Sequence, residues 1–507
     1  MSAHETFALL PQIVIAAAII LILIGIAIKR GYLVSFIVAL LGFAGAFGGL
    51  FFLPDSTHIG GLLVVDSYAR FFSGVILAAN LSVLLLSYGY LRGYRENREE
   101  FFVLLLLESL GAMVLVESSN FASFFLGLEL LSVSLYALLA YVRTRRISIE
   151  SGLKYFVPAA VSSAFLLFGM ALLYGETGTM EFAKIGTALT SGVGVITPGS
   201  ATTIIMTTGL VMVIVAIGFK LALVPFHMWA ADVYQGSAAP VTASIATVSK
   251  IAVFALFFRF FAGVDLAASP VVAWVLTIVA VFSMLGGSWL ALRQSNVKRM
   301  LAYSSTAHLG YLMLPLLVGG AAGAAASAFY LVAYSATTLG LFGVITVFSG
   351  VEGEAEQFAD YAGLSRKRPL LSLVFIVMLL SIAGIPLTAG FMGKLYLLGV
   401  GVGATRWLLA ASLVASSAIG LFYYLRLVAV QFARRGESVG TTAAPGAQGL
   451  SESVAAPFSG GVRGWTLDAR VTAAAGIILV AVTAVVIGLG VFPSPLLGLI
   501  ARLVPTL

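Results

Sequence analysis

The sequence predicts an all-α integral membrane protein with about fourteen transmembrane helices. Of its 507 residues, 60% are hydrophobic and only 10% are charged, whereas roughly 25% of the residues in a soluble domain are charged. Apolar runs also follow one another along the whole chain, and about 20 apolar residues suffice to cross a bilayer as a helix. Because a soluble globule needs a polar shell, this composition excludes a soluble enzyme, a nucleic-acid-binding protein and a disordered chain.

Each expected span is an apolar run of sufficient length. The runs cover residues 9–28, 32–53, 70–91, 101–116, 120–142, 152–174, 203–228, 239–261, 270–292, 299–317, 325–348, 370–399, 407–432 and 471–492. The first run ends in Lys29-Arg30 rather than at a small-residue cleavage site, so it is not expected to be a cleavable signal.

Basic residues alternate between the connections and predict the orientation. The connections after odd-numbered spans carry Lys29, Arg30, Arg92, Arg95, Arg98, Arg143, Arg145, Arg146, Arg293, Lys298, Arg299, Arg366, Lys367, Arg368, Arg434 and Arg435. The even-numbered connections carry little beyond Lys184 and Arg406, and the 7–8 connection carries Asp232 instead of a base. The net charge of +7 therefore reflects membrane topology. The alternation predicts that the odd-numbered connections lie in the cytoplasm and that both termini lie on the outer side of the membrane.

Two spans contain helix-breaking residues. Pro225 lies inside the seventh span, and Gly384, Pro386 and Gly390 lie inside the twelfth. Proline removes a backbone donor, and in a bilayer such breaks face protein or water rather than lipid. Broken spans at corresponding places of two halves are typical of transporter repeats. Because the two breaks are five spans apart, an odd number, the second repeat is expected to be inverted.

The predicted organisation has five parts. Residues 1–100 hold spans 1–3, residues 101–261 form the first five-helix repeat (spans 4–8), and residues 270–432 form the second, inverted repeat (spans 9–13). Residues 436–464 are rich in Gly, Ala and Ser and predict a flexible cytoplasmic linker, and residues 465–507 hold the last span and a tail.

Several ionisable residues lie within or beside the spans, and placing one at the centre of the bilayer costs at least about 2.5–3.5 kcal/mol. The candidates are Glu129, Lys220, Lys250, His308, Lys394 and His227. Glu129 is the central acid available to pair with Lys220, and Lys250 is the midpoint of the eighth span. A buried lysine whose carboxylate partner moves, and a histidine, can each load and release a proton near neutral pH. The set therefore predicts a proton relay, with Ser249, Thr247, Tyr303 and Ser304 able to hold bridging water. Protons are expected to enter through the first repeat and to leave through the second.

Other readings remain open for some of these residues. Arg259 and Arg426 lie near span ends, and the favoured explanation is that their long side chains extend to the membrane interface. Glu108 is either functional or a polar group near an interface, and His308 is either a relay member or a hydrogen-bonded structural histidine. With no cysteine and four histidines without metal-ligand spacing, the chain is expected to carry no redox cofactor or metal.

Three segments resemble a known family. GFKLALVPFHMWAADVYQGSAAPVTASIATVSK, NVKRMLAYSSTAHLGY and GIPLTAGFMGK are similar to the antiporter-like subunits of respiratory complex I, which are homologous to the large subunits of Mrp-type sodium/proton antiporters. The resemblance covers spans 4–13. The positions that match the family's proton-carrying residues are Glu129, Lys220, Lys250, Lys394 and His308. One departure is Ala230-Ala231, where the family often has Thr-Pro.

The resemblance implies a proton-translocating subunit of an NADH:quinone oxidoreductase in a bacterial inner (plasma) membrane. NADH, FMN, iron–sulfur clusters and quinone are then expected on partner subunits, and the partners include other membrane subunits of that complex. A lysine at position 394 and the motif VPFHMW favour this reading over a subunit of an Mrp-type cation/proton antiporter. A membrane-bound hydrogenase or related ferredoxin-linked complex is a third reading. A scaffold without a proton path is the fourth, and the central charges argue against it.

Overall fold

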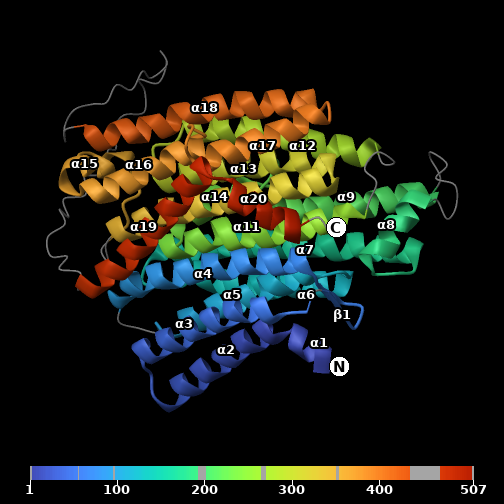
Figure 1. The fold of residues 1–507 in the computed structure, drawn as a ribbon, viewed down its shortest axis with the longest axis horizontal. Coiled ribbons are helices and arrows are strands. Elements are labelled where there is room, and N and C mark those ends of the chain that lie inside the picture. Colours follow the sequence, from blue (N-terminus) through green and yellow to red (C-terminus); the bar gives the residue numbers. More distant parts are fainter. Residues whose placement is uncertain are drawn as a thin grey trace.

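The helices lie roughly parallel in a broad bundle, from α2 and α3 at one side to α18 at the other (Figure 1). In this computed structural model, the described residues are 3–54, 56–94, 98–191, 201–263, 270–349, 353–433 and 469–504. The helices are α1 (Ala3–Ala8), α2 (Leu10–Ile28), α3 (Tyr32–Gly49), α4 (Ser67–Arg92), α5 (Glu100–Glu117), α6 (Phe121–Leu139), α7 (Arg146–Thr177), α8 (Phe182–Ser191), α9 (Ala201–Leu221), α10 (Met228–Gly236), α11 (Ala239–Ala262), α12 (Pro270–Leu292), α13 (Val297–Val318), α14 (Gly320–Phe348), α15 (Leu364–Lys367), α16 (Pro369–Ala383), α17 (Ala389–Gly403), α18 (Trp407–Phe432), α19 (Ala469–Val491) and α20 (Ser494–Leu503), with 3₁₀ turns at Leu50–Phe52 and Phe358–Tyr361.

The prediction of a helical membrane protein is confirmed, and one short hairpin is the only strand pair in the described residues. Within the described residues, twelve helices are long and apolar enough to cross a membrane. Of the other two expected spans, one corresponds to α5 and the other to the pair α16 and α17. The count of fourteen agrees with this arrangement and remains a prediction. The expected linker at 436–464 lies outside the described residues.

Several boundaries differ from the predicted ones because hydropathy does not detect polar helix ends. Helix α7 begins at Arg146, six residues before the expected span, and ends at Thr177. The helices α1, α8 and α20 were not predicted. Helix α19 crosses obliquely over the bundle and contacts α4, α14, α16 and α17, and α20 continues on α4 and α14 (Figure 1).

Both predicted helix breaks are present. The seventh span is interrupted where α9 ends at Leu221, and the next helix, α10, begins at Met228. Between them, Ala222 adopts a positive φ of 57°. The twelfth span is interrupted where α16 ends at Ala383, and it continues as α17 from Ala389. Each predicted five-helix unit thus contains one interrupted helix, as the repeat hypothesis requires. The inverted relation of the two units remains a prediction.

A short hairpin at one end of the bundle was missed by the sequence analysis. Strands β1 (Thr57–Ile59) and β2 (Leu63–Val65) pair antiparallel through a turn at Gly60 and Gly61, both with positive φ. The Ser119 amide and the Ser123 hydroxyl donate to the carbonyl of Leu62, which fixes the hairpin to the start of α6. Strands of three residues are too short to produce a recognisable alternation of polar and apolar residues.

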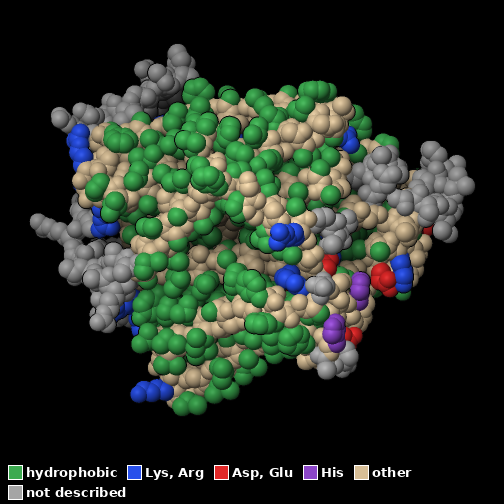
Figure 2. All heavy atoms as spheres, viewed as in Figure 1, with side chains coloured by type: hydrophobic (Ala, Val, Ile, Leu, Met, Phe, Trp, Pro, Cys, Tyr) green, Lys and Arg blue, Asp and Glu red, His purple; other side chains and the backbone are tan. Residues whose placement is uncertain are grey.

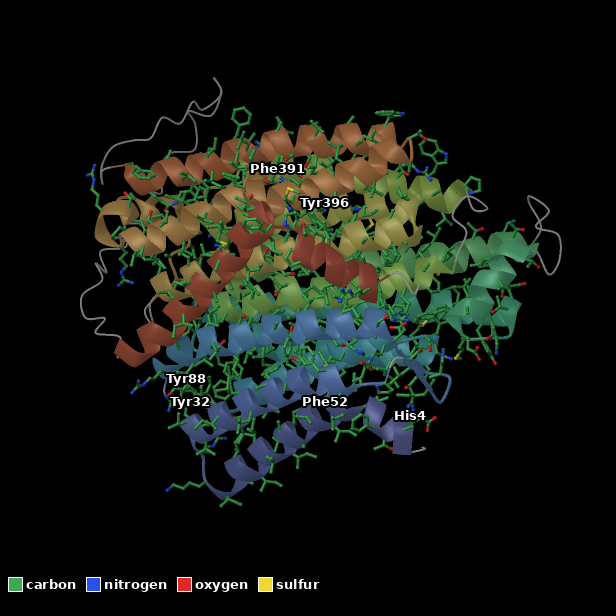
Figure 3. The ribbon with its side chains drawn as sticks, viewed as in Figure 1. His4, Tyr32, Phe52, Tyr88, Phe391 and Tyr396 are labelled. Atoms are coloured by element: carbon green, nitrogen blue, oxygen red, sulfur yellow. The ribbon has the colours of Figure 1, made fainter. Side chains whose placement is uncertain are left out.

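The surface has the distribution of a membrane protein. Figure 2 shows a broad apolar face with Lys and Arg side chains along its left edge, and acidic and histidine side chains at the right. At the same left end, Tyr32 of α3 stacks on Tyr88 of α4 with ring centroids 5.1 Å apart (Figure 3). Basic and aromatic side chains at the ends of the apolar runs are typical of a membrane interface.

The connections after the odd-numbered spans meet at one end of the bundle. Arg30 pairs with Glu100, which begins α5. Asp232, the unexpected acid of the 7–8 connection, accepts from Lys154 and Arg299, so basic residues of neighbouring connections neutralise it. Contacts between successive odd connections are what an alternating topology requires.

The centre of this charged layer is Glu354, whose side chain is fully buried (0% exposed). Its carboxylate lies 2.5 Å from Lys298 Nζ and 3.4 Å from Arg145, and it also accepts from the Tyr90 hydroxyl and the Ala239 amide. Burial alone would raise the pKa of Glu354, but Lys298 and Arg145 hold it below its ordinary value. One loop residue thereby ties α4, the start of α7, α11 and α13 together.

We expect Glu354→Gln to lower the free energy of unfolding by about 3–5 kcal/mol, because it leaves the fully buried Lys298 without a counter-charge and leaves Arg145 with Glu356 as its remaining carboxylate partner. The matched control is Glu150→Gln, an exposed partner of Lys154, which is expected to cost less than about 1 kcal/mol. Because the pKa of Glu354 is depressed, its stabilisation is present above the ordinary glutamate range and is lost as the pH falls below it. Unfolding midpoints in detergent across acidic pH measure both effects, and equal costs for the two variants would contradict the account.

Candidate proton-transfer site

The first broken helix places Lys220 in a buried aromatic pocket. Its ammonium donates to Ser132 Oγ at 2.6 Å and lies 5.5 Å from the Tyr155 ring centroid and 5.9 Å from that of Tyr136. Ser132 donates its own hydroxyl hydrogen to the carbonyl of Leu128, so the ammonium is the donor in the contact with Ser132. The lysine is therefore stabilised by one hydroxyl and by aromatic faces.

Glu129 lies one helical turn before Ser132 on α6, but it does not form an ion pair with Lys220 among the described residues. Its carboxylate accepts from Ser163 Oγ of α7 at 2.5 Å. The arrangement corresponds to the open state of the predicted Glu129–Lys220 pair, with Ser132 as the partner of the lysine. The sequence analysis missed both serines. The position of Ser132, three residues after Glu129 on the same helix face, is the one signal that could have found it.

Lys250 lies in the most deeply buried helix, α11, and is itself 0% exposed. Its ammonium donates to the backbone carbonyl of Lys220 at 2.8 Å and lies 4.9 Å from the Trp229 ring centroid. That carbonyl belongs to the last turn of α9, where helical carbonyls lack intrahelical donors and carry partial negative charge. The break near Pro225 therefore creates an acceptor for the central lysine.

The second broken helix uses the same device. Lys394 of α17 donates at 2.8 Å to the carbonyl of Ala383, the last residue of α16, and at 2.8 Å to Ser417 Oγ of α18. The ammonium also lies 5.6 Å from the Tyr311 ring centroid. Phe391 and Tyr396, labelled in Figure 3, come from the same helix as Lys394.

His308 is joined to Lys394 by a small shared cavity. Its Nδ1 lies 2.5 Å from the Tyr330 hydroxyl and its Nε2 lies 3.3 Å from the Tyr424 hydroxyl. The cavity is lined by His308, Tyr330, Tyr334, Thr337, Ser381 and Lys394, together with Ala333, Ile382 and Gly390. The accessible wall of this cavity is almost entirely apolar, so what the histidine and the lysine share is the lining of one small space.

His227 stands apart from these residues. It lies between Pro225 and α10, 7% exposed, and its ring centroid is 6.2 Å from that of Tyr303. Neither of its ring nitrogens has a hydrogen-bond partner among the described residues. The other five candidates occur as two groups, Glu129 with Lys220 and Lys250 in the first unit, and His308 with Lys394 in the second.

Two of the four residues expected to hold water make direct contacts instead. Ser304 Oγ is hydrogen bonded to the Tyr424 hydroxyl, and Thr247 donates back to the carbonyl of Ala243 in its own helix. A cluster of tyrosine hydroxyls around His308, from α14 and α18, was not foreseen, because partners on distant helices leave no trace in local sequence. Within the described residues, no group of three or more His, Asp or Glu side chains could hold a metal ion.

The fold, the two broken helices and the buried lysines define a class of membrane transport protein. The chain matches the NADH:quinone oxidoreductase/Mrp antiporter transmembrane family over residues 118–420 and belongs to that family. It is 40% identical to NADH-quinone oxidoreductase subunit N of Ectopseudomonas mendocina (strain ymp), over 98% of this chain and 96% of the relative.

Solved structures agree with this assignment. A chain of respiratory complex I from Thermus thermophilus with bound aureothin is 31% identical, with a TM-score of 0.76, over 97% of this chain and 99% of that one. The Mrp complex from Dietzia sp. DQ12-45-1b matches with a TM-score of 0.81 at 21% identity, covering 100% of this chain and 98% of that one. The archaeal membrane-bound sulfane sulfur reductase matches with a TM-score of 0.80 at 22% identity, covering 99% and 98%. At these low identities, the last two show a shared fold alone.

Proposed function

We propose that the chain is the N-type, proton-translocating membrane subunit of an NADH:quinone oxidoreductase. The observation that carries this proposal is the set of three buried lysines, two of which donate to carbonyls at the ends of interrupted helices. The 40% identical relative is named as subunit N of such an enzyme. As part of that complex, the chain contributes to a translocase, whose quinone reduction on other subunits drives the transfer of protons through this one.

The proposed relay has two halves. In the first, Glu129 and Lys220 take up a proton and pass it toward Lys250, whose ammonium already contacts the Lys220 backbone. In the second, His308 and Lys394 share a cavity, and Lys394 hands the proton to the outer side. Charges on Lys250 and Lys394 repel each other in a low-dielectric path, so loading Lys250 favours release from Lys394. His227 is placed beside the break of the first half as a further candidate.

Glu129 also supports an assembly with other membrane subunits. It is half-buried in the middle of α6, on a face where Leu126 is 64% exposed and Val133 is 58% exposed. An ionisable residue at this depth does not face lipid. Another membrane subunit is therefore expected to cover this face of α6. NADH, FMN, iron–sulfur clusters and quinone belong to partner subunits in this proposal, and the chain itself binds no cofactor.

We expect Glu129 and Lys220 to act as a coupled pair in proton transfer. Each single alanine variant should impair transfer by the reconstituted complex, because it removes one of the two groups that take up the proton. The double variant should cost less than the sum, with a coupling of about 0.5–3 kcal/mol in a double-mutant cycle. The matched control pairs Glu129→Ala with Lys184→Ala, an exposed lysine, and this cycle should be additive. Additivity in both cycles would show that Glu129 and Lys220 do not interact.

The orientation follows from the basic connections, with both termini on the outer side of a bacterial inner membrane. The labelled chain ends lie at the same end of the bundle, opposite the turn that joins α2 to α3 (Figure 1). We expect reporter fusions placed after Arg146 and after Arg368 to report the cytoplasm. An external signal from either position would overturn this topology.

A further inference from the structure

One buried acid is not used by the relay. Glu108 of α5 is 0% exposed, and both of its carboxyl oxygens lie 2.7 Å from Ser244 Oγ of α11. Ser244 Oγ also lies 2.8 Å from Asn80 Oδ1 of α4. Asn80 Nδ2 donates to Ser109 Oγ at 2.6 Å, and Ser109 donates to the carbonyl of Leu105 at 2.9 Å. The four polar side chains thus form a continuous chain across three helices.

The number of hydrogens in this chain depends on the state of Glu108. Ser244 has one hydroxyl hydrogen, but it is surrounded by three acceptor oxygens, two from Glu108 and one from Asn80. A protonated Glu108 resolves the shortage, since it donates to Ser244, which donates to Asn80, and so on to Leu105. One Glu108 oxygen then donates to Ser244, and each later link of the chain also has one donor and one acceptor; such chains strengthen cooperatively. If the oxygen and nitrogen of the Asn80 amide exchanged places, Asn80 would donate to Ser244, and the Ser244 hydrogen could go to Glu108. An ionised Glu108 would then still have only this one hydrogen-bond donor.

No cation compensates Glu108 among the described residues. On α11, Lys250 is directed to the Lys220 carbonyl and Arg259 is paired with Asp66. On α4, Arg70 donates to the carbonyls of Leu53 and Pro54, and Arg92 lies in the last turn. On α6 the ionisable residues are Glu129, which accepts from Ser163, and Tyr136, which lies beside Lys220. On α2, Gln12 donates a hydrogen bond to Glu117, at the far end of α5 from Glu108. A buried carboxylate without a cation is costly, so the neutral acid is the favoured form.

We propose that Glu108 is a further proton-loading site, which holds a proton on its carboxyl through the chain Ser244–Asn80–Ser109. Glu108 lies on the first helix of the first five-helix unit, and its polar chain reaches Asn80 of α4 in the N-terminal part. Ser244 and Lys250 are six residues apart on α11, or about 9 Å along the helix axis. A proton on Lys250 therefore attracts the ionised form of Glu108, so loading of the one favours release from the other. This exchange rests on the proposed transport function, whereas the protonation of Glu108 does not.

Infrared spectroscopy of the full chain in lipid nanodiscs tests the protonation state. At neutral pH, the wild-type minus Glu108→Gln difference spectrum should contain the carbonyl band of one protonated carboxylic acid, which shifts in D₂O. The control is Glu100→Gln on the same helix, where the acid is paired with Arg30 and only carboxylate bands should be lost. Should Glu108→Gln not fold, Ser244→Ala serves instead, because losing its hydrogen-bond acceptor should move the acid band to higher frequency. Carboxylate bands alone in the Glu108→Gln difference, or no shift in Ser244→Ala, would overturn the proposal.

Proton transfer by the whole complex in vesicles tests the loading role. Glu108→Gln should lower the rate several-fold, and Glu108→Asp should retain more of it, because aspartate can still release a proton. A Glu108→Gln complex that pumps at the wild-type rate would mean that the proton is structural, and it would overturn the loading role. Lys250→Ala is measured in parallel. If Lys250→Ala also leaves pumping unchanged, the transport function itself fails, which distinguishes the two outcomes.

Discussion

Replacing Lys250 with alanine is expected to lower proton transfer by the reconstituted complex by about 100-fold, the lower end of what a positioned proton-transfer group contributes. Lys250 is fully buried at the midpoint of α11, and its ammonium is held by the Lys220 carbonyl and the Trp229 ring. Without it, neither the carbonyl at the end of α9 nor the apolar neighbours can hold a proton. Electron transfer should fall in parallel if the complex is tightly coupled.

Lys250→Arg should not restore transfer. Arginine keeps the charge and the contact to the carbonyl, but it does not release its proton at physiological pH. This variant separates a structural role for the cation, which arginine would fill, from a role in proton exchange. Lys184→Ala, at an exposed position, is the control and should behave as the wild type. Wild-type pumping by Lys250→Ala would favour the scaffold reading.

Loss of Lys394, by substitution or by displacement, is expected to have a similarly large effect. Lys394→Ala removes the ammonium that connects α17 to the end of α16 and to Ser417. Gly384→Ala is expected to displace the Lys394 side chain without replacing it. Gly384 has a φ of +89°, and a Cβ there would lie 2.9 Å from Lys394 Cδ and 3.2 Å from Lys394 Nζ. The methyl group therefore pushes the lysine away from the Ala383 carbonyl.

The matched control for Gly384→Ala is Gly399→Ala in α17, the helix that carries Lys394. A Cβ at Gly399 meets nothing within 4 Å, and the residue is helical. We expect Gly399→Ala to pump normally, and Gly384→Ala to lose most proton transfer as well as about 1–3 kcal/mol of stability from backbone strain. Equal pumping rates for the two alanine variants would show that the position of Lys394 does not matter.

The sequence predicted the helices and the buried charges better than it predicted their partners. Long apolar runs and interrupting prolines are local signals, so the spans and both breaks follow from them. The ligands of the lysines are different. Ser132 and Ser417 lie on other helices, and the carbonyls of Lys220 and Ala383 become acceptors only because the helices end there.

Glu354 and Glu108 show the same limit. Glu354 lies in a polar connection, where nothing in the local sequence indicates that Lys298 and Arg145 approach it from elsewhere. Glu108 was recognised as ambiguous, because a glutamate near the middle of an apolar run fits both a functional and an interfacial group. Its hydrogen-bond chain depends on the packing of α4, α5 and α11 together. Tertiary contacts of this kind are set by the whole bundle.

The most direct test of the central claim is the ratio of protons transferred to NADH oxidised, measured with the whole complex in sealed vesicles. The complex would carry this chain either as the wild type or with Lys220→Ala, Lys250→Ala and Lys394→Ala combined. If the chain carries protons on these lysines, the triple variant should either transfer fewer protons per NADH or lose both activities together. An assembled triple variant with the wild-type ratio at the wild-type rate would contradict the account.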